Sequence, residues 1–247
     1  MMSVTKTGGS QNARTYTEKP NDVGAKGSGK TIEVKNSEEL KSALANAESG
    51  TTIRLADGEY NGNFELKGKS NVTIEGSRNA KINGGDMNSG YALHVEDSEN
   101  ITLKGFSVTG GQKGIVFDGT NKSLLDDLSI TGTGQEAVHF RKNSSDNVIQ
   151  NSFINDTGNI DPGYGEGVYI GSDDEKGIDL SNNNKVLGVE FGDDVTAENV
   201  DIKEHTQGNV VAYSKLNESG ITGEHFADTA IDVKPAASGT LLYGNFI

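Results

Sequence analysis

Hydrophobic and polar residues alternate over short stretches through most of this chain, and four stretches share one template. They are residues 135–141 (QEAVHFR), 165–171 (GEGVYIG), 197–204 (AENVDIKE) and 229–235 (TAIDVKP). Alternation with a period of two is the pattern of a β-strand that buries one face. Each stretch therefore predicts a short strand whose apolar residues turn toward a core and whose polar residues turn outward.

Stacking the four strands in register places the same kinds of side chain above one another. The inward positions are Val138, Val168, Val200 and Ile231, followed by Phe140, Ile170, Ile202 and Val233. The first outward row is His139, Tyr169, Asp201 and Asp232, and the second is Arg141, Gly171, Lys203 and Lys234. A third row, Glu136, Glu166, Glu198 and Thr229, has the parity of the inward residues and reaches solvent only where the preceding bend turns it out. Acids, bases, an imidazole and a phenol are thus predicted on one surface.

The template belongs to a longer repeat. The middle outward residue advances from His94 through Val116, His139, Tyr169 and Asp201 to Asp232, at intervals of 22 to 32 residues. Repeats of this length predict a solenoid. Asparagine recurs before the second strand of a row, at Asn71, Asn100, Asn147, Asn184 and Asn209. Stacked side-chain amides would hydrogen-bond from row to row, so we expect an inward asparagine ladder.

The N-terminal part of the chain contains the one stretch with a helical pattern. Ser37 is followed by an apolar run with helical spacing that ends at Gly50, which predicts an N-capped amphipathic helix. Residues 1–29 are polar and without periodicity, and we expect a disordered tail followed by one domain at 30–247. Residues 24–31 match the phosphate-loop pattern, but no buried strand precedes them and no helix follows, so nucleotide binding is not expected.

Composition narrows the possible partners. The chain has 247 residues, 33 glycines, 3 prolines and 32% hydrophobic residues, which favours an all-β chain with frequent turns. A net charge of −14 argues against nucleic acid as a partner, although local lysine and arginine or a bridging divalent cation would still hold an acidic glycan. The absence of cysteine excludes disulfides, thiolate metal sites and a cysteine nucleophile. No apolar run approaches the ~20 residues that span a bilayer, so we expect no membrane partner. We also expect no organic cofactor.

The predicted helix, residues 57–76 (DGEYNGNFELKGKSNVTIEG), the asparagines and the rows resemble the right-handed parallel β-helix proteins of the pectate-lyase-like superfamily over residues 31–247. The resemblance implies an all-β solenoid in which three parallel sheets wind round a narrow apolar core and an α-helix caps the N-terminal end. It also implies a secreted or cell-surface protein that acts on a polysaccharide, most often a uronate polymer cut by β-elimination. The chain departs from the pattern because it lacks long, distinctive loops and a complete calcium-binding set of acids.

β-Elimination at a uronate needs a base at C5, a cation or proton donor for the carboxylate, and an acid for the leaving oxygen. Lys203 or Lys234 would be the base if the neighbouring cation lowers its pKa. The fork of Arg141 suits the substrate carboxylate. Tyr169 or His139 would supply the proton.

A second interpretation makes the lysines substrate clamps. Asp201 and Asp232 each precede a lysine by one pleat and would pair with it, which keeps the lysine charged. Glu204 and His205 follow in the next turn, and we assign them to substrate binding.

The three stacked glutamates predict a metal site. Glu136, Glu166 and Glu198 at a spacing of ~4.8 Å would repel one another without a cation, and calcium prefers such oxygen ligands. Aligned solvated acids are the competing interpretation. The acidic runs at 173–175 and 193–194 are interpreted as solvated loops.

The sequence therefore favours a polysaccharide lyase for an acidic, uronate-containing polymer. The alternatives are a non-catalytic glycan-binding or adhesive module, and a glycoside hydrolase or uronate epimerase on the same fold. A hydrolase would use paired carboxylates such as Asp201 and Asp232. The chain ends at Ile247 inside an expected strand, so we expect that the natural chain continues, that another copy covers this end, or that the bare edge is tolerated.

Overall fold

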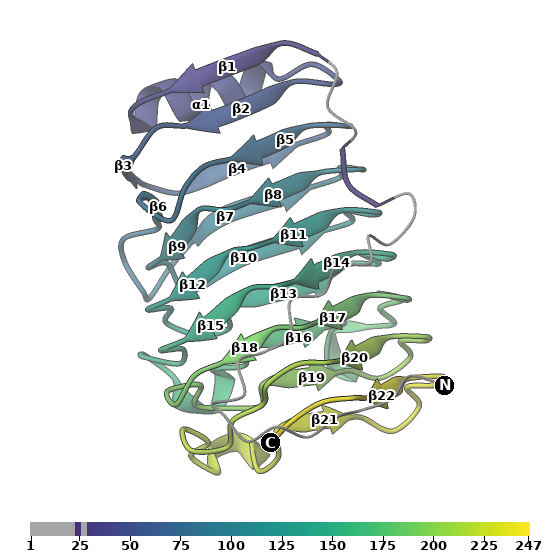
Figure 1. The fold of residues 1–247 in the computed structure, drawn as a ribbon. Helices are drawn as coiled ribbons and strands as arrows, with labels where there is room; N and C mark the ends of the chain where they lie inside the picture. Colours follow the sequence, from purple (N-terminus) through teal and green to yellow (C-terminus); the bar gives the residue numbers. More distant parts are fainter. Residues whose placement is uncertain (1–22, 26–28) are drawn as a thin grey trace, which may run out of the picture.

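The structure is a computed structural model that describes residues 23–25 and 29–247. Short parallel strands wind into a right-handed β-helix with three sheets (Figure 1). Sheet A contains, in spatial order, β1 (Thr31–Val34), β2 (Thr52–Leu55), β5 (Thr73–Glu75), β8 (Thr102–Lys104), β11 (Leu124–Asp126), β14 (Val148–Gln150), β17 (Lys185–Leu187), β20 (Val210–Ala212) and β22 (Leu241–Tyr243). The predicted fold class is confirmed.

Two further sheets complete the coil. Sheet B contains β3 (Gly58–Asn61), β6 (Ala80–Asn83), β9 (Ser107–Thr109), β12 (Ser129–Thr131), β15 (Phe153–Asn155) and β18 (Glu190–Phe191). Sheet C contains β4 (Phe64–Lys67), β7 (Tyr91–Glu96), β10 (Lys113–Asp118), β13 (Val138–Arg141), β16 (Val168–Ile170), β19 (Val200–Ile202) and β21 (Ile231–Val233). A full turn runs from sheet C through sheet A to sheet B. The C strands are the ones that carry the four-stretch template.

The predicted register is the observed one. His139 pairs with Tyr169, Tyr169 with Asp201, and Asp201 with Asp232, which makes the first outward row continuous on sheet C. The inward residues of β13, β16 and β19 are fully buried, whereas Ile231 and Val233 in β21 are partly exposed. Burial of the valines and isoleucines on the inner face stabilises the stack through the hydrophobic effect.

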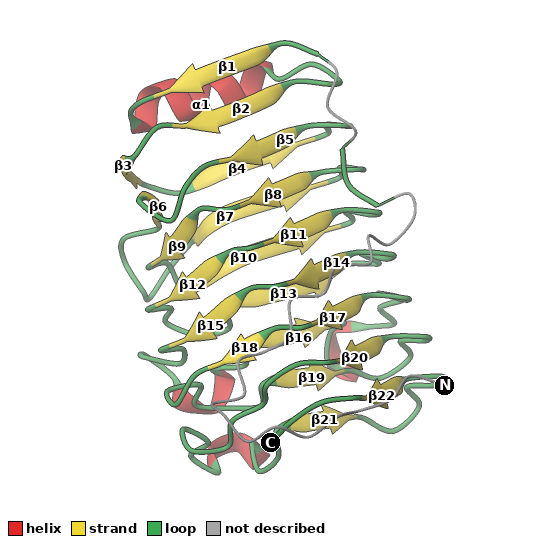
Figure 2. Cartoon of the chain, in the orientation of Figure 1, coloured by secondary structure: helices red, strands yellow, loops and turns green. Residues whose placement is uncertain are grey.

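Helix α1 (Ser37–Asn46) lies at the β1 end of the coil (Figure 2). Its cap is Asn36 rather than Ser37, because the Asn36 side chain accepts a hydrogen bond from the Glu39 N–H at 2.9 Å. Leu40, Ala43 and Leu44 are buried against the first strands. The helix thus covers the apolar core at this end, as expected.

The asparagine ladder is shorter than predicted. Asn147 and Asn184 donate their backbone N–H groups to the side-chain oxygens of Asn184 and Asn209, at 3.0 and 2.8 Å, and all three are buried. Asn71 and Asn100 are not part of it. Both adopt left-handed backbone conformations (φ 57° and 54°) at the bend itself, where asparagine is tolerated better than other residues with a β-carbon.

Most of the predicted tail, residues 1–22 and 26–28, lies outside the described residues, and so does part of the phosphate-loop match. Residues 23–25 contact the outside of sheet A, where Val23 packs against a cluster formed by Val148, Leu187, Val210 and Ala212. The Gly24 N–H donates to the Lys122 carbonyl at 2.8 Å and the Ala25 N–H to Thr102 Oγ1 at 2.9 Å. Among the described residues, no helix is long and apolar enough to cross a membrane. The predicted contact with another copy beyond Ile247 stays a prediction.

Candidate functional site

Two long segments flank β16 on the outside of sheet C. Residues 156–167 join β15 to β16 and residues 171–184 join β16 to β17, whereas the preceding coil uses 132–137 and 142–147. The expectation that the chain lacks long loops is therefore wrong in this coil. The segments contain the short helices η1 (Pro162–Tyr164) and η2 (Asp174–Lys176), and a third, η3 (Glu224–Phe226), lies before β21. The longest coil is thus the one that carries Tyr169.

The outward side chains between these segments are nearly as buried as a core. Tyr169 and Lys203 are each 7% exposed, and Asp201 is 2% exposed. Charged and polar groups are costly to bury unless they are paired. Their contacts with one another therefore determine the chemistry of the site.

Tyr169, Asp173 and Lys203 form a connected group. The Tyr169 hydroxyl donates to Asp173 Oδ1 at 2.8 Å, and Lys203 Nζ lies 2.8 Å from the same oxygen. Lys203 Nζ also donates to Asp201 Oδ2 at 3.2 Å and lies 5.0 Å from the Tyr169 ring centroid. Asp173 was expected in a solvated acidic run, and Asp174 and Glu175 are indeed exposed. The Asp173 side chain is only about half exposed, because the 171–184 segment brings it against Tyr169 and Lys203. The only sequence signal was its position just after the template strand.

Both proton-bearing groups are held in their protonated forms. Burial lowers the pKa of Lys203, but the carboxylates of Asp201 and Asp173 outweigh it and raise that pKa above its ordinary value. Burial, with the charges of Asp201 and Asp173, raises the pKa of the Tyr169 phenol far above its usual range. At pH 7, deprotonation of a lysine with a pKa of 10.5 or more costs at least about 5 kcal/mol of free energy. The geometry therefore favours Lys203 as a cation over Lys203 as a free base.

Lys203 lowers the pKa of Lys234, as predicted, but the net shift of that pKa is upward. Lys234 Nζ is hydrogen-bonded to Asp232 Oδ2, and burial lowers its pKa less than Asp232 and Asp201 raise it. Each lysine thus pairs with the aspartate one pleat before it. This is the second of the two interpretations that the sequence allowed.

Gly171 leaves the position beside Lys203 without a side chain. Its φ of 98° lies in the region that favours glycine, and a β-carbon there would lie 2.9 Å from Thr206 Cγ2 and 3.0 Å from Lys203 Cβ. Its carbonyl accepts a hydrogen bond from His139 Nε2 at 2.9 Å. Glycine at this position is therefore required both by the backbone conformation and by the close packing of Thr206 and Lys203 against it.

His139 and Glu136 are linked to Lys113. His139 Nδ1 lies 3.3 Å from Glu136 Oε1, and Lys113 Nζ is hydrogen-bonded to the same oxygen. Burial lowers the pKa of His139. Burial raises the pKa of Glu136, but His139 and Lys113 outweigh it and hold the carboxyl below its usual range. Glu136 is therefore neutralised by its own neighbours and lies outside the carboxylate group described next.

Glu166, Glu198 and Asp201 place one oxygen each within 4.8 Å of one another. All three are buried, and Glu166 Oε2 and Asp201 Oδ1 have no hydrogen-bond partner among the described residues. Burial raises the pKa of Glu198, raises that of Asp201 to about 7 and, together with nearby acids, raises that of Glu166 well above its usual value. Three buried carboxylates need protons or a cation, and an all-oxygen set with unused ligand atoms fits calcium. Asp201 thus takes the place that the sequence assigned to Glu136.

Arg141 faces a neighbouring cluster. Its Nε and Nη2 donate to Asp118 at 2.6 and 3.2 Å, and Nη2 also donates to the Tyr91 hydroxyl at 3.0 Å. Asp118 is 2% exposed and also contacts His94 Nε2 at 3.0 Å and Lys142 Nζ at 2.9 Å. The guanidinium fork predicted for a substrate carboxylate is therefore occupied by Asp118.

The remaining predicted residues lie in the turn after β19. His205 Nε2 lies 2.7 Å from Asp174 Oδ1, so it contacts the 171–184 segment. Glu204 is half-buried, and its Oε2 is enclosed without a hydrogen-bond partner among the described residues. Both residues therefore border the Lys203 site.

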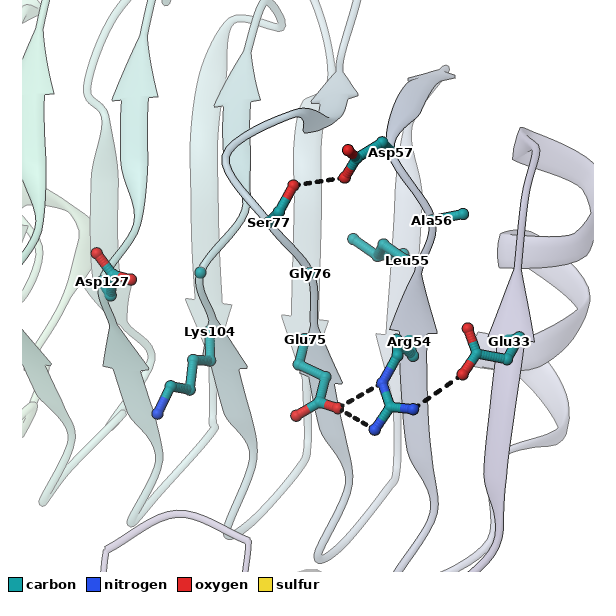
Figure 3. Close-up of a pocket in the computed structure, with 11 residues that line it drawn as sticks. Glu33, Arg54, Leu55, Ala56, Asp57, Glu75, Gly76, Ser77, Lys104 and Asp127 are labelled. Carbon is teal, nitrogen blue, oxygen red and sulfur yellow. Dashed lines mark hydrogen bonds and ion pairs between the residues drawn. The ribbon is translucent and has the colours of Figure 1, made fainter.

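A cavity of about 380 Å³ lies elsewhere, at the turn from sheet A to sheet B (Figure 3). Arg54 contacts Glu33 at 2.9 Å and Glu75 at 2.8 Å there, and Ser77 donates to Asp57 at 2.5 Å. None of the residues predicted for the site lines this cavity. Its ionic groups are paired at the surface, so we assign the chemistry to sheet C.

Comparison with known proteins agrees with the fold. A family described as right handed beta helix region matches residues 43–191. The structure of an alginate lyase from Paenibacillus sp. str. FPU-7 is similar with a TM-score of 0.84 and 39% sequence identity, covering 87% of this chain and 75% of that one. Pectate lyase Pel9A is similar with a TM-score of 0.64 and 15% identity, covering 86% and 60% of the two chains.

A pectate lyase from Xanthomonas campestris shares the fold with a TM-score of 0.58 and 13% identity, covering 91% of this chain and 82% of that one. At these identities the pectate lyases show the fold alone. No protein in the search of curated sequences matches the chain. The extent of the family match and the identity to the alginate lyase show that this chain belongs to the right-handed β-helix family, within the pectate-lyase-like superfamily.

Proposed function

We propose that this protein is a polysaccharide lyase that cleaves a uronate-containing polymer by β-elimination, with alginate as the first substrate to test. The observation that carries the proposal is the group in which the buried side chains of Tyr169 and Lys203 share the carboxylate of Asp173, which is about half exposed. The 39% identity to an alginate lyase supports the choice of polymer. Such a substrate implies a secreted or cell-surface protein.

The resting charges suggest the division of roles. Lys203, held as an ammonium ion, neutralises the uronate carboxylate and the negative charge that develops on it when the C5 proton leaves. The C5–H electron pair forms the C4–C5 double bond as the C4–O4 bond breaks. Tyr169, held as a phenol, donates its proton to the departing O4. Asp173 holds the Tyr169 hydroxyl and the Lys203 ammonium group next to each other, because both contact its Oδ1.

Two neighbours are the candidates for the acceptor of the C5 proton. One is the carboxylate of Asp201, and the other is the imidazole of His139, whose Nε2 donates to the Gly171 carbonyl and whose Nδ1 lies 3.3 Å from Glu136 Oε1. His139→Asn and Asp201→Asn distinguish them. Loss of the proton acceptor is expected to lower kcat by about 10²- to 10⁴-fold, and loss of the other residue by less.

Glu166, Glu198 and Asp201 would hold a divalent cation, for which calcium is the best fit. When bound beside Lys203, it would add positive charge for the substrate carboxylate. Calcium is then expected to raise the melting temperature of the wild type and not that of Glu198→Gln, with Glu75→Gln, a glutamate outside both groups of possible metal ligands, as the control. Equal shifts in all three proteins, or none, would mean that protons neutralise the three acids.

The decisive experiment follows ultraviolet absorbance during incubation with alginate, pectate or a glycosaminoglycan, because elimination creates a conjugated double bond. The wild type is expected to increase absorbance on at least one polymer. Lys203→Ala is expected to abolish the increase while polymer binding is retained, and Lys234→Ala to reduce it less. Binding without turnover by the wild type favours a glycan-binding module. New reducing ends without absorbance favour a hydrolase that uses Asp201 and Asp232.

A further inference from the structure

Asp179 is a buried carboxylate in an exposed stretch. It lies near the end of the 171–184 segment and is 4% exposed, whereas its neighbours Ile178 and Leu180 are 71% and 44% exposed. A buried carboxylate needs several donors to offset the loss of water. The donors of Asp179 therefore indicate what it holds in place.

Two donors come from the preceding coil. The backbone N–H groups of Lys142 and Asn143 donate to Asp179 Oδ2 at 2.7 Å and Oδ1 at 2.9 Å. Both residues have left-handed backbone conformations, with φ of 52° and 65°. Successive N–H groups in a turn form a concavity that binds anions. Asp179 fills this concavity.

Two further donors come from the segment itself. Ser172 Oγ donates to Asp179 Oδ2 at 2.8 Å, and Ser181 Oγ donates to Oδ1 at 2.7 Å. Asp179 therefore ties both ends of the segment to each other and to the preceding coil. The exposed tip, which contains η2, lies between these two ends.

Ser172 is the residue before Asp173, so the carboxylate of Asp179 constrains the backbone one residue from the group that accepts from Tyr169 and Lys203. We propose that Asp179 is a positioning residue for the reaction: by holding Ser172, it sets Asp173 against Tyr169 and Lys203. The inference rests on the proposed lyase function. Asp179 acts through Asp173 and takes no proton itself.

The first test needs no activity. Asp179→Asn keeps the size of the side chain but offers one acceptor oxygen instead of two to the four donors. Trypsin cleavage between Lys176 and Gly177, identified by fragment mass, is expected to accelerate at least about tenfold as the segment opens locally. Asp146→Asn is the control, because Asp146 lies in the 142–147 turn to which Asp179 binds and its side chain accepts no hydrogen bond from the described residues. Equal rates of trypsin cleavage in the wild type and in Asp179→Asn would overturn the proposal.

The second test asks whether Asp179 acts through Asp173. Asp179→Asn is expected to lower kcat about 10²-fold, the cost of a small misplacement, with little change in KM. In an Asp173→Asn background the same substitution is expected to change kcat by less than about twofold, since the group it positions is gone. Independent, multiplying losses would instead indicate a general structural role and would overturn the proposal.

Ser172→Ala serves as a milder variant if Asp179→Asn folds poorly. It removes the hydrogen bond next to Asp173, and it is expected to lower kcat more than Ser181→Ala does, although both remove one donor to Asp179. Equal losses would contradict the positioning role. If the wild type degrades no uronate polymer, the proposed function fails, while the trypsin assay still decides whether Asp179 holds the segment.

Discussion

The outer faces of sheets A and C are both built on stacked parallel strands, but their charged side chains differ in exposure to water. On sheet A, Arg54 lies between Glu33 and Glu75, and the side chains of Arg54 and Glu33 are about half exposed. On sheet C, Lys203 and Asp201 are almost fully buried, and Asp201 retains an oxygen without a partner among the described residues. Both faces carry ladders of charge. They differ because long segments flank the sheet C row at β16, whereas the sheet A row at Arg54 has none beside it. The difference teaches that the same kind of charged row is screened by water on one face and is held by its neighbours on the other.

The largest contrast is expected from removing one hydroxyl on each face. Tyr169→Phe deletes the proposed proton donor and is expected to lower kcat by about 10²- to 10⁴-fold, with polymer binding retained. Tyr243→Phe, in the ring pair of Tyr213 and Tyr243 on sheet A, should leave kcat unchanged. Initial rates measured by absorbance compare the two. Equal effects would remove the distinction between the faces.

A stability contrast of similar size is expected from the acids. Asp118→Asn leaves Arg141, Lys142 and His94 around a neutral, buried side chain, and we expect a loss of about 3 kcal/mol. Glu75→Gln on the sheet A face should cost less than about 1 kcal/mol, because an exposed pair is screened by water. Urea denaturation of both variants measures the difference. A loss as large for Glu75→Gln would show that exposure does not separate the two ladders.

Low pH should reduce the contribution of Asp118 to the free energy of unfolding. Burial raises the pKa of Asp118, but hydrogen bonds from His94, Arg141 and Lys142 outweigh it and hold that pKa far below its ordinary value. Between the pKa of Asp118 in the folded chain and its pKa in the unfolded chain, the unfolded chain binds more protons than the folded one. The stabilisation of the fold by the Asp118 carboxylate is therefore complete above about pH 4, and it is lost as the pH falls toward the pKa of the folded state. The stability difference between wild type and Asp118→Asn should therefore shrink below about pH 4. A difference that stays constant down to pH 2 would contradict the cause given for the shift.

The smallest effect is expected at the sheet A ladder itself. Arg54→Ala removes the ion pairs with Glu33 and Glu75 and should change the free energy of unfolding very little, because water screens the exposed pairs, and added salt should diminish the effect further. Turnover should be unaffected. A marked loss of activity would assign a functional role to the cavity beside Arg54.

The sequence alone determined the solenoid, because strand stacking depends on a local pattern. Period-two alternation at Val168, Val200 and their equivalents fixed which residues turn inward, and the constant template fixed the register of the outward row. The sequence therefore also predicted that Tyr169, Asp201 and Lys203 would share one surface. Two predictions at bends were wrong. The helix cap is Asn36 and not Ser37, and Asn71 and Asn100 do not belong to the asparagine ladder. Bends depend on backbone geometry that the alternation of side chains does not encode.

Only the tertiary structure decided the charges and partners at the site. Asp173 looked like part of a solvated run, and its contact with Tyr169 and Lys203 arises because Asp179 fastens the 171–184 segment to the preceding coil. Likewise, Glu136 is neutralised by Lys113, so the carboxylate group forms from Glu166, Glu198 and Asp201 instead. Protonation depends on burial and on neighbours across coils, and these distances are set by loop folding rather than by strand period.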